Sequence, residues 1–266
     1  MSYFLRRFLP KAKFQAFSTM TYSYVRKWTG CKVYSKWESD GVSWAVEDLD
    51  PKDDDEAVNM MMTDFVNGEP MLTRLGISKD DLRFAGTEMF WADIIARRMT
   101  VACYRYSQGH REIAAINLCF VKSINDTKLT IPENSHKGIQ CLINTIHYME
   151  DLEDIHKFLD ADQYLGGAGL LVLSKFRGSR LGYRILAARE ALCRELGVHS
   201  TAAIFSGPAS QKSAQNSGFI TLFERSFADL AERGFYFPGD QSKTIKMMYV
   251  EYDADKKSKL IPKSKF

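Results

Sequence analysis

The sequence predicts an α/β fold with a mixed central sheet of about seven strands flanked by helices. Apolar or alternating stretches typical of strands recur along the chain, and stretches with apolar residues three and four positions apart, typical of helices, separate them. At 266 residues, 45% of them hydrophobic and 26% charged, the chain is long enough for one large core. The order of strands and helices is that of a sheet with helices on both faces.

The first predicted elements are a strand and two helices. Residues 42–46 alternate between large apolar and small side chains, as in a half-buried strand. Acidic residues 53–56 favour a helix start, because negative charge is stabilised there, and this helix should end near Gly68. Ser78 opens a capping-box pattern for a second helix that reaches Arg98.

A hairpin and an insert follow. Residues 100–106 and 111–121 have strand patterns joined by a polar turn, and the second strand is apolar on both faces. A helical pattern then runs from Ile139 toward Phe158. The later stretches with strand character are 164–173, 200–205, 220–230 and 244–252.

The stretch 164–219 carries the strongest functional signal. Its apolar strand leads into a turn rich in arginine and glycine, residues 177–182, and this turn opens a helix that Gly197 ends. Backbone N–H groups at a helix start lack partners within the helix, and the helix dipole adds positive charge there. The turn therefore predicts a site for a phosphate group.

This strand, turn and helix resemble the acetyl-CoA-binding core of the GCN5-related N-acetyltransferases. Arg177 and Gly182 occupy the first and last positions of the R-x-x-G-x-G/A motif of that family, and Phe219 follows the glycine that ends the core. The resemblance implies the fold of this superfamily. It also implies that acetyl-CoA binds through Val172, Leu173, Arg177, Gly178, Ser179, Arg180, Leu181 and Gly182.

Further positions resemble the insect-type arylalkylamine (dopamine) N-acetyltransferases, over about residues 42–252. They are Glu69 before Pro70, Ser206 with Ser210, and the insert between the hairpin and the apolar strand. The resemblance implies an acyltransferase that moves an acetyl group from acetyl-CoA to the primary amine of a small arylalkylamine, by direct attack and without a metal.

Glu69 is the predicted general base. A primary alkylamine resembles lysine, whose pKa is about 10.4, so a base must remove its proton before it can attack. Pro70 disfavours the α conformation for residue 69, which places the carboxylate on an extended segment. Taken by itself, a glutamate in a loop is usually a surface residue. Its match to the base position of the family is what favours catalysis.

Ser206 and Ser210 are the other two predicted catalytic residues. In the resembled family, serines at these positions relay protons or position the amine and the thiolate that leaves. The alternative is structural, because Ser206 precedes a proline that favours a first helical turn and Ser210 lies within that turn. Both readings stay open for each serine.

Arg180 departs from the family pattern, which usually has glycine there. A side chain forced into a left-handed conformation costs about 1–2 kcal/mol. A direct bond from the guanidinium to a phosphate of CoA can offset this cost. The departure motivates one alternative, an acyl-CoA-binding regulatory module without catalysis. A second alternative is an acetyltransferase for polyamines or another amine acceptor.

Charge is distributed unevenly along the chain. Of 36 basic residues, 13 lie in 1–37 and 256–266, which contain no acid, so the remainder has 23 basic and 33 acidic residues and a net charge of −10. We expect a basic extension over residues 1–40, an N-acetyltransferase domain over 41–253, and a basic tail over 254–266. An acidic body favours a cationic amine and argues against a nucleic-acid partner.

Location and assembly are expectations from composition. No apolar run reaches the roughly 20 residues that span a bilayer, so no stable membrane insertion is expected. The five cysteines are widely spaced, without a C-x-x-C pair, which fits a reduced compartment and no zinc site. We expect a cytoplasmic monomer or weak dimer, or a mitochondrial protein if residues 1 to about 30 are a transit peptide.

Overall fold

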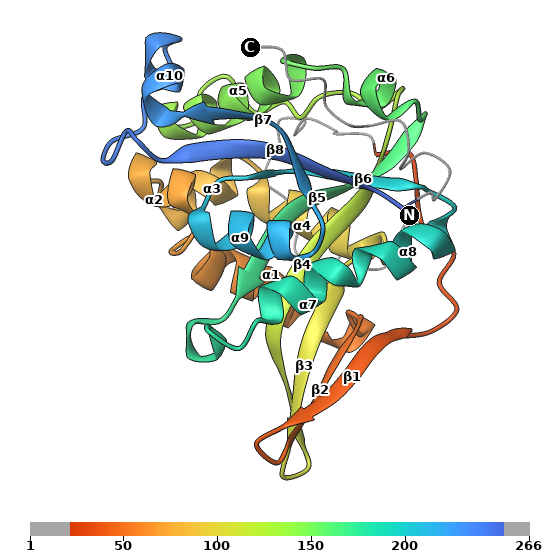
Figure 1. Ribbon diagram of the computed structural model, residues 1–266. Helices are drawn as coiled ribbons and strands as arrows, with labels where there is room; N and C mark the ends of the chain where they lie inside the picture. The colour runs from red at the N-terminus through yellow and green to blue at the C-terminus, as the bar shows by residue number, and fades with distance from the viewer. Residues whose placement is uncertain (1–21, 253–266) are drawn as a thin grey trace, which may run out of the picture.

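The computed structural model describes residues 22–252 and contains an eight-stranded mixed sheet (Figure 1). The strand order is β1-β2-β3-β4-β5-β6-β8-β7; only the β5–β6 pair is parallel. The strands are β1 (Val33–Ser39), β2 (Val42–Asp48), β3 (Val101–Ser107), β4 (His110–Ser123), β5 (Gln163–Val172), β6 (Ser200–Phe205), β7 (Ile220–Ser226) and β8 (Thr244–Glu251). The predicted fold class is confirmed, with one strand more than expected.

Helices cover both faces of this sheet. Figure 1 shows α7 and α8 on one side of the strands and α1 and α4 on the other. The helices and helical turns are η2 (Pro51–Asp53), α1 (Asp54–Met60), η3 (Met61–Phe65), α2 (Pro70–Leu75), α3 (Lys79–Phe84), α4 (Thr87–Ala96), α5 (Lys137–Asp151), α6 (Ile155–Leu159), η4 (Ser174–Phe176), α7 (Leu181–Ala187), α8 (Arg189–Leu196), α9 (Pro208–Asn216) and α10 (Phe227–Glu232).

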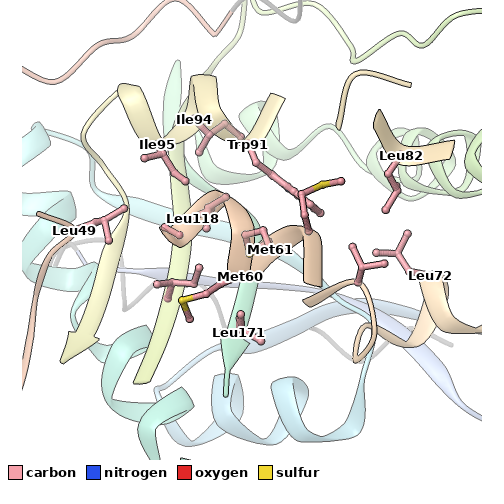
Figure 2. Packing of buried hydrophobic residues seen from close by; sticks show 14 of the residues in the cluster. Leu49, Met60, Met61, Leu72, Leu82, Trp91, Ile94, Ile95, Leu118 and Leu171 are labelled. Carbon is pink, nitrogen blue, oxygen red and sulfur yellow. The ribbon is translucent and has the colours of Figure 1, made fainter. Parts of the chain in front are cut away.

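Two large apolar cores hold these layers together. Met61, Trp91 and Leu118 belong to the core between the sheet and α1–α4, where side chains from helices and strands point toward one another (Figure 2). Ile185 and Leu192 belong to the core on the opposite face, beneath α7 and α8. β4 is buried along most of its length because its side chains enter both cores, as the sequence predicted.

The region before β3 differs from the sequence expectation in two ways. The capping box at Ser78 is present, but the helix expected to reach Arg98 is divided into α3 and α4 at Gly86, whose φ is +80°. In addition, the short helix α2 begins directly after Glu69, which is its N-cap residue. A six-residue helix is too short for its apolar period to stand out in a sequence.

The chain before β2 also packs on the domain. Tyr22 is buried, and the guanidinium of Arg26 donates to Asp48 at 2.6 Å and also contacts Glu195. The extension predicted over residues 1–40 therefore overlaps the packed structure from Tyr22 onward, and it includes strand β1. The tail predicted over 254–266, and most of the transit peptide considered for residues 1 to about 30, lie outside the described residues.

Within residues 22–252, no helix is long and apolar enough to cross a membrane. The same part of the chain contains no cluster of three or more histidine, cysteine or acidic side chains arranged to hold a metal ion. All five cysteines are free, and three of them are buried.

Candidate active site

The centre of the site is a wedge between β5 and β6. These parallel strands are paired at a single position, Leu165 with Thr201. Beyond this pair the two strands have no ladder partners in each other. β5 also carries a bulge against β4: Gly167 and Gly169 have partners in register, whereas Ala168 between them has none. Ala168 therefore has no ladder partner on β4, and it lines the cavity described below. The Gly-Gly-Ala-Gly run is the sequence signal that could have indicated this bulge.

The predicted phosphate turn lies at one end of the wedge, where α7 begins. Arg180 is the N-cap residue of α7 and has a left-handed backbone (φ +58°, ψ 20°), as its place in the motif predicts. No side chain from the described residues caps this helix start. A Cβ on Gly182 would lie 2.8 Å from Ser213 Oγ, so glycine permits the close approach of α7 to α9.

Arg177 lies between this turn and the Glu69 segment. Its Nε donates to the carbonyl of Val172 at 3.4 Å, and its Nη2 lies 3.2 Å from the position that a Cβ on Gly68 would take. The side chain thus lies beside Gly68 instead of filling the start of α7. It contributes a cation to the wall that joins the two predicted parts of the site.

Glu69 is a buried carboxylate. Its backbone is extended (φ −79°, ψ 124°), as Pro70 predicts, and the residue is 8% exposed. Oε2 accepts from the Leu72 N–H at 2.6 Å and Oε1 accepts from Ser206 Oγ at 2.5 Å. Burial raises the pKa of Glu69, while the hydrogen bonds from Ser206 and from the amides of Leu72 and Met71 oppose this shift.

The two serines differ in what they contact. Ser206 donates to Glu69, and the N-cap residue of α9 is Gly207, so the capping alternative for Ser206 is wrong. Ser210 donates to the carbonyl of Gly207 at 2.9 Å, as its structural alternative predicts. Both serines nevertheless line the same cavity as Glu69.

Because the two serines have different partners, we expect their alanine variants to differ in the pH dependence of the reaction rate. Because the hydrogen bond from Ser206 lowers the pKa of Glu69, Ser206→Ala should raise that pKa further. The carboxylate form is the base, so the acidic limb of the pH–rate profile should move to higher pH. Ser210→Ala should leave the limb in place. Initial rates between pH 5 and 9 give the pH–rate profile of each variant. If the acidic limb of the Ser206→Ala profile lies where that of the wild type lies, the coupling of Ser206 to Glu69 is contradicted.

One cavity of about 1660 Å³ connects the helix start to Glu69. Of the eleven residues predicted for the site, it is lined by Glu69, Val172, Arg177, Gly178, Arg180, Leu181, Gly182, Ser206 and Ser210. Leu173 and Ser179 do not line it. The backbone of Leu173, predicted to contact acetyl-CoA, is engaged within the protein: its N–H donates to the carbonyl of Ala114, and its carbonyl accepts from the N–H of Phe176.

Arg189 is a residue that the sequence did not single out. It is 1% exposed, lines the cavity, and has no acidic partner among the described residues. Nε donates to Asn117 Oδ1 at 2.8 Å and Nη1 to Thr201 Oγ1 at 2.9 Å. Asn117 donates in turn to the carbonyl of Gly169, and Thr201 to that of Leu165. Arg189 is thereby linked to the backbone of β5 on both sides of the bulge.

The buried position of Arg189 leaves little sequence signal. Arginine on a helix is ordinarily exposed, and nothing in its helical pattern distinguishes Arg189 from its exposed neighbour Arg194. The indirect signal is Gly167, where a Cβ would lie 2.3 Å from Arg189 Nη2. That glycine is required by a side chain 22 positions later in the chain, so only the folded structure shows the relation.

Apolar side chains form the walls of the cavity beyond Glu69. Phe65 and Trp91 meet edge to face with ring centroids 5.7 Å apart, and both line the cavity. Phe235 does not line the cavity, and its ring packs on Tyr148. Leu72, Ile139, Leu142, Ile143 and Ile146 complete this part of the wall.

Comparison with known proteins places this geometry in a fold family. No protein-family model and no curated protein matches the chain. Among solved structures, arylalkylamine N-acetyltransferase 7 from the yellow fever mosquito Aedes aegypti superposes with a TM-score of 0.79 at 27% identity, over 86% of this chain and 100% of the other. The chain has the GCN5-related N-acetyltransferase fold, of the arylalkylamine type.

Two more distant structures share this acetyltransferase fold. Arylalkylamine N-acetyltransferase 2 from Aedes aegypti has a TM-score of 0.66 at 18% identity, over 79% of this chain and 99% of the other. A polyamine N-acetyltransferase from Drosophila melanogaster has a TM-score of 0.60 at 13% identity, over 78% of this chain and 99% of the other. At these identities the similarity concerns the fold alone.

Proposed function

We propose that this acyltransferase moves an acetyl group from acetyl-CoA to the primary amine of a small arylalkylamine, with Glu69 as the general base. One observation carries the proposal: a single cavity joins the uncapped start of α7 to a buried carboxylate. A thiol-release assay of the purified protein with acetyl-CoA and a panel of aromatic amines and polyamines tests it. Absence of release with every amine would contradict it.

The residues at the α7 end suit coenzyme A. Free N–H groups at the helix start and the cation of Arg180, which has no ion-pair partner in the described chain, can hold phosphate groups. The wedge between β5 and β6 leaves an unpaired strand edge where a pantetheine arm can lie. When bound, acetyl-CoA supplies a thioester carbonyl that is activated toward amines.

The residues at the Glu69 end suit proton removal from an amine. A carboxyl whose pKa is raised by burial is a stronger base than an ordinary glutamate, and Ser206 holds its Oε1 in place. The backbone of Ala168, which has no partner on β4 and lines the cavity, can provide a donor for a developing oxyanion. Ser210 can protonate a leaving thiolate only by releasing its bond to Gly207.

The cavity supports an aromatic amine better than a polyamine. A polyamine needs several carboxylates without basic partners, spaced along its length. Of the six acidic residues of the lining, three are paired, Glu88 with Arg83, Asp93 with Arg97 and Glu150 with Lys122, whereas Glu69, Asp55 and Asp64 form no ion pair within the described residues. The wall between Glu69 and Glu150 is apolar or aromatic, which suits an arylalkyl group.

The alternative of a regulatory acyl-CoA-binding module rests on Arg180 and is tested by Arg180→Gly. Glycine adopts the left-handed backbone without strain, so the variant should fold normally. Loss of a charge-assisted contact to phosphate should raise the KM for acetyl-CoA roughly tenfold while kcat is kept. A lower KM in the variant would show that the Arg180 side chain hinders the donor, and an unchanged KM would show that it makes no contact with the phosphates. Thermal stabilisation by acetyl-CoA without thiol release would favour the regulatory module.

A further inference from the structure

The cavity continues past Glu69, away from the start of α7, as a passage beneath α5. One face of this helix lines the passage with residues at helical spacing, namely Ile139, Leu142, Ile143, Ile146, His147 and Glu150. α5 packs on α2, and Leu142 packs against the apolar cluster that contains Met71, two residues from Glu69. The first part of α5 therefore lies at the Glu69 end of the passage, and Glu150 lies at its distal end.

The passage is longer than a small arylalkylamine. The eleven residues of helix from Ile139 to Glu150 rise about 16 Å. Along β5, Tyr164 lies four residues from Ala168, or about 13 Å, and both line the cavity. An extended chain advances about 1.2 Å per bond, so phenethylamine, with six bonds from its nitrogen to the far carbon of its ring, spans roughly 7 Å.

The part of the passage nearer Glu69 is apolar. From Ile139 to Ile146 the helix rises about 10 Å, which equals eight or nine bonds of an extended chain. Leu129 and Ile131 also line the cavity, and they pack against the same core as Ile139. A straight apolar chain of this length thus has apolar side chains beside it throughout.

The distal end is polar, but its charges are compensated. Lys122 and Glu150, which both line the cavity, form an ion pair at 2.6 Å. His147 Nε2 is buried without a partner among the described residues, and burial is the main cause that lowers the pKa of this imidazole. Neither a further methylene group nor a second ammonium group finds a favourable partner here.

Tyr22 forms the end wall, from a segment that precedes the sheet. Burial raises the pKa of its phenol, and the negative charge of Glu150 raises it further, which places Tyr22 at the distal end. Its ring stacks on Phe120 with centroids 3.9 Å apart and an interplanar angle of 27°. Arg97, at the end of α4, donates to the carbonyl of Tyr22. These contacts fix the wall and give the passage a definite length.

We propose that this passage binds the alkyl chain of a straight-chain primary amine of about eight carbons, as a further acceptor for the acetyl group. The amine nitrogen lies beside Glu69, and the methylene groups lie along Leu142, Ile143 and Ile146. Each methylene that leaves water for this apolar stretch adds to the affinity. A carbon beyond Ile146 meets the polar distal end and adds little.

The inference rests on the proposed function, because the reacting groups are the same. The amine nitrogen forms a bond to the acetyl carbon of the thioester, and the bond from that carbon to sulfur breaks. The ammonium form of the amine loses two protons, one to the thiolate of CoA and one, through Glu69, to the solvent. The products are an N-alkylacetamide and the thiol of CoA.

The first test is a series of butylamine, hexylamine, octylamine and decylamine. Calorimetric titration of the full chain, saturated with CoA, should show affinity that rises roughly tenfold from butylamine to octylamine, since part of the gain from burial is lost to ordering the chain. Decylamine should gain less than about twofold over octylamine. A flat series, or a rise that continues unchanged through decylamine, overturns the inference.

A second ammonium group provides the next comparison. The ligand 1,8-diaminooctane has the same chain as octylamine and places its second cation toward the distal end, where Glu150 is already paired with Lys122. We expect it to bind at least about tenfold more weakly than octylamine, because a charge without a partner is costly to remove from water. Equal or tighter binding contradicts the inference and favours a polyamine acceptor.

Ile146→Phe tests where the chain lies. The larger side chain fills the middle of the passage, so octylamine should lose its advantage over hexylamine, whereas the shorter phenethylamine should keep its affinity. Asn144→Phe is the matched control, because Asn144 is exposed on the same helix and does not line the cavity. A wild-type preference for octylamine in Ile146→Phe, with an unchanged melting temperature, contradicts the placement. If Ile146→Phe does not fold, the wild-type series decides alone.

Thiol release separates this inference from the proposed function. Release of thiol with phenethylamine but not with octylamine overturns the alkylamine as an acceptor and leaves the proposed function standing. Absence of release with every amine, with the chain-length series as expected, contradicts the proposed reaction and leaves the binding passage standing.

Discussion

Glu69→Gln is expected to lower kcat by about 10²- to 10⁴-fold, because a general base contributes a factor of this order. The glutamine oxygen can still accept from the Leu72 N–H and its amide can donate to Ser206 Oγ, so the start of α2 is preserved. Titration with CoA should give an affinity close to that of the wild type. Stopped-flow or steady-state thiol release measures the loss.

The pH dependence separates the base from a structural role. Because the pKa of Glu69 is raised in the folded protein, an ionised Glu69 destabilises the fold above that pKa, and protonation on lowering the pH removes the cost. Glu69→Gln should therefore melt at the same or a higher temperature at pH 7, and the acidic limb of the rate profile should disappear. Wild-type rates in this variant across pH 6–9 would falsify the assignment. Glu190→Gln, on the exposed face of α8 and outside the cavity, is the control.

Arg189→Met is expected to lower kcat about a hundredfold while the KM for acetyl-CoA changes little. The variant removes the bonds to Asn117 and Thr201, which hold the carbonyls of Gly169 and Leu165 beside the bulge at Ala168. A displacement of about 1 Å in a reacting site costs a factor of this size. Arg189 thus acts as a positioning residue, through the backbone of β5.

The melting temperature distinguishes this role from simple stabilisation. The variant removes a buried charge but leaves Asn117 Oδ1 without its arginine donor, which costs about 1–3 kcal/mol, so we expect the melting temperature to fall by roughly 2–10 °C. Arg189→Lys keeps the charge but cannot make both bonds, and it should recover only part of kcat. Arg194→Met, an exposed residue of the same helix, serves as the matched variant. A full wild-type kcat in folded Arg189→Met rules out the positioning role.

Much of the fold could be predicted because the period of apolar residues is a local property. The hairpin strands β3 and β4, the apolar strand β5 and the helix that Gly197 ends are where the pattern places them. The errors have physical causes. Gly86 divides a helix whose apolar pattern continues across it, and β1 was assigned to a basic extension because its alternation is weak and its residues are mostly half-exposed or exposed.

The candidate site was only partly predictable. Glu69 was indicated by its match to the base position of the resembled family, and Pro70 predicted its extended backbone. The left-handed backbone of Arg180 was indicated by its place in the turn. Leu173 was misjudged because the pairing of its backbone depends on β4, which lies far away in sequence. Tyr22 could not be recognised, since its position depends on Phe120 and Arg97.

By itself the sequence determined the elements, the helix start suited to phosphate and the extended backbone at Glu69, because each follows from neighbouring residues through steric and hydrogen-bonding preferences. Only the tertiary structure decided that Ser206 bonds to Glu69, that Arg189 is buried beside the bulge, and that Tyr22 closes the cavity. Those relations join residues 72 to 137 positions apart. They arise from packing of the whole chain, which no local pattern records.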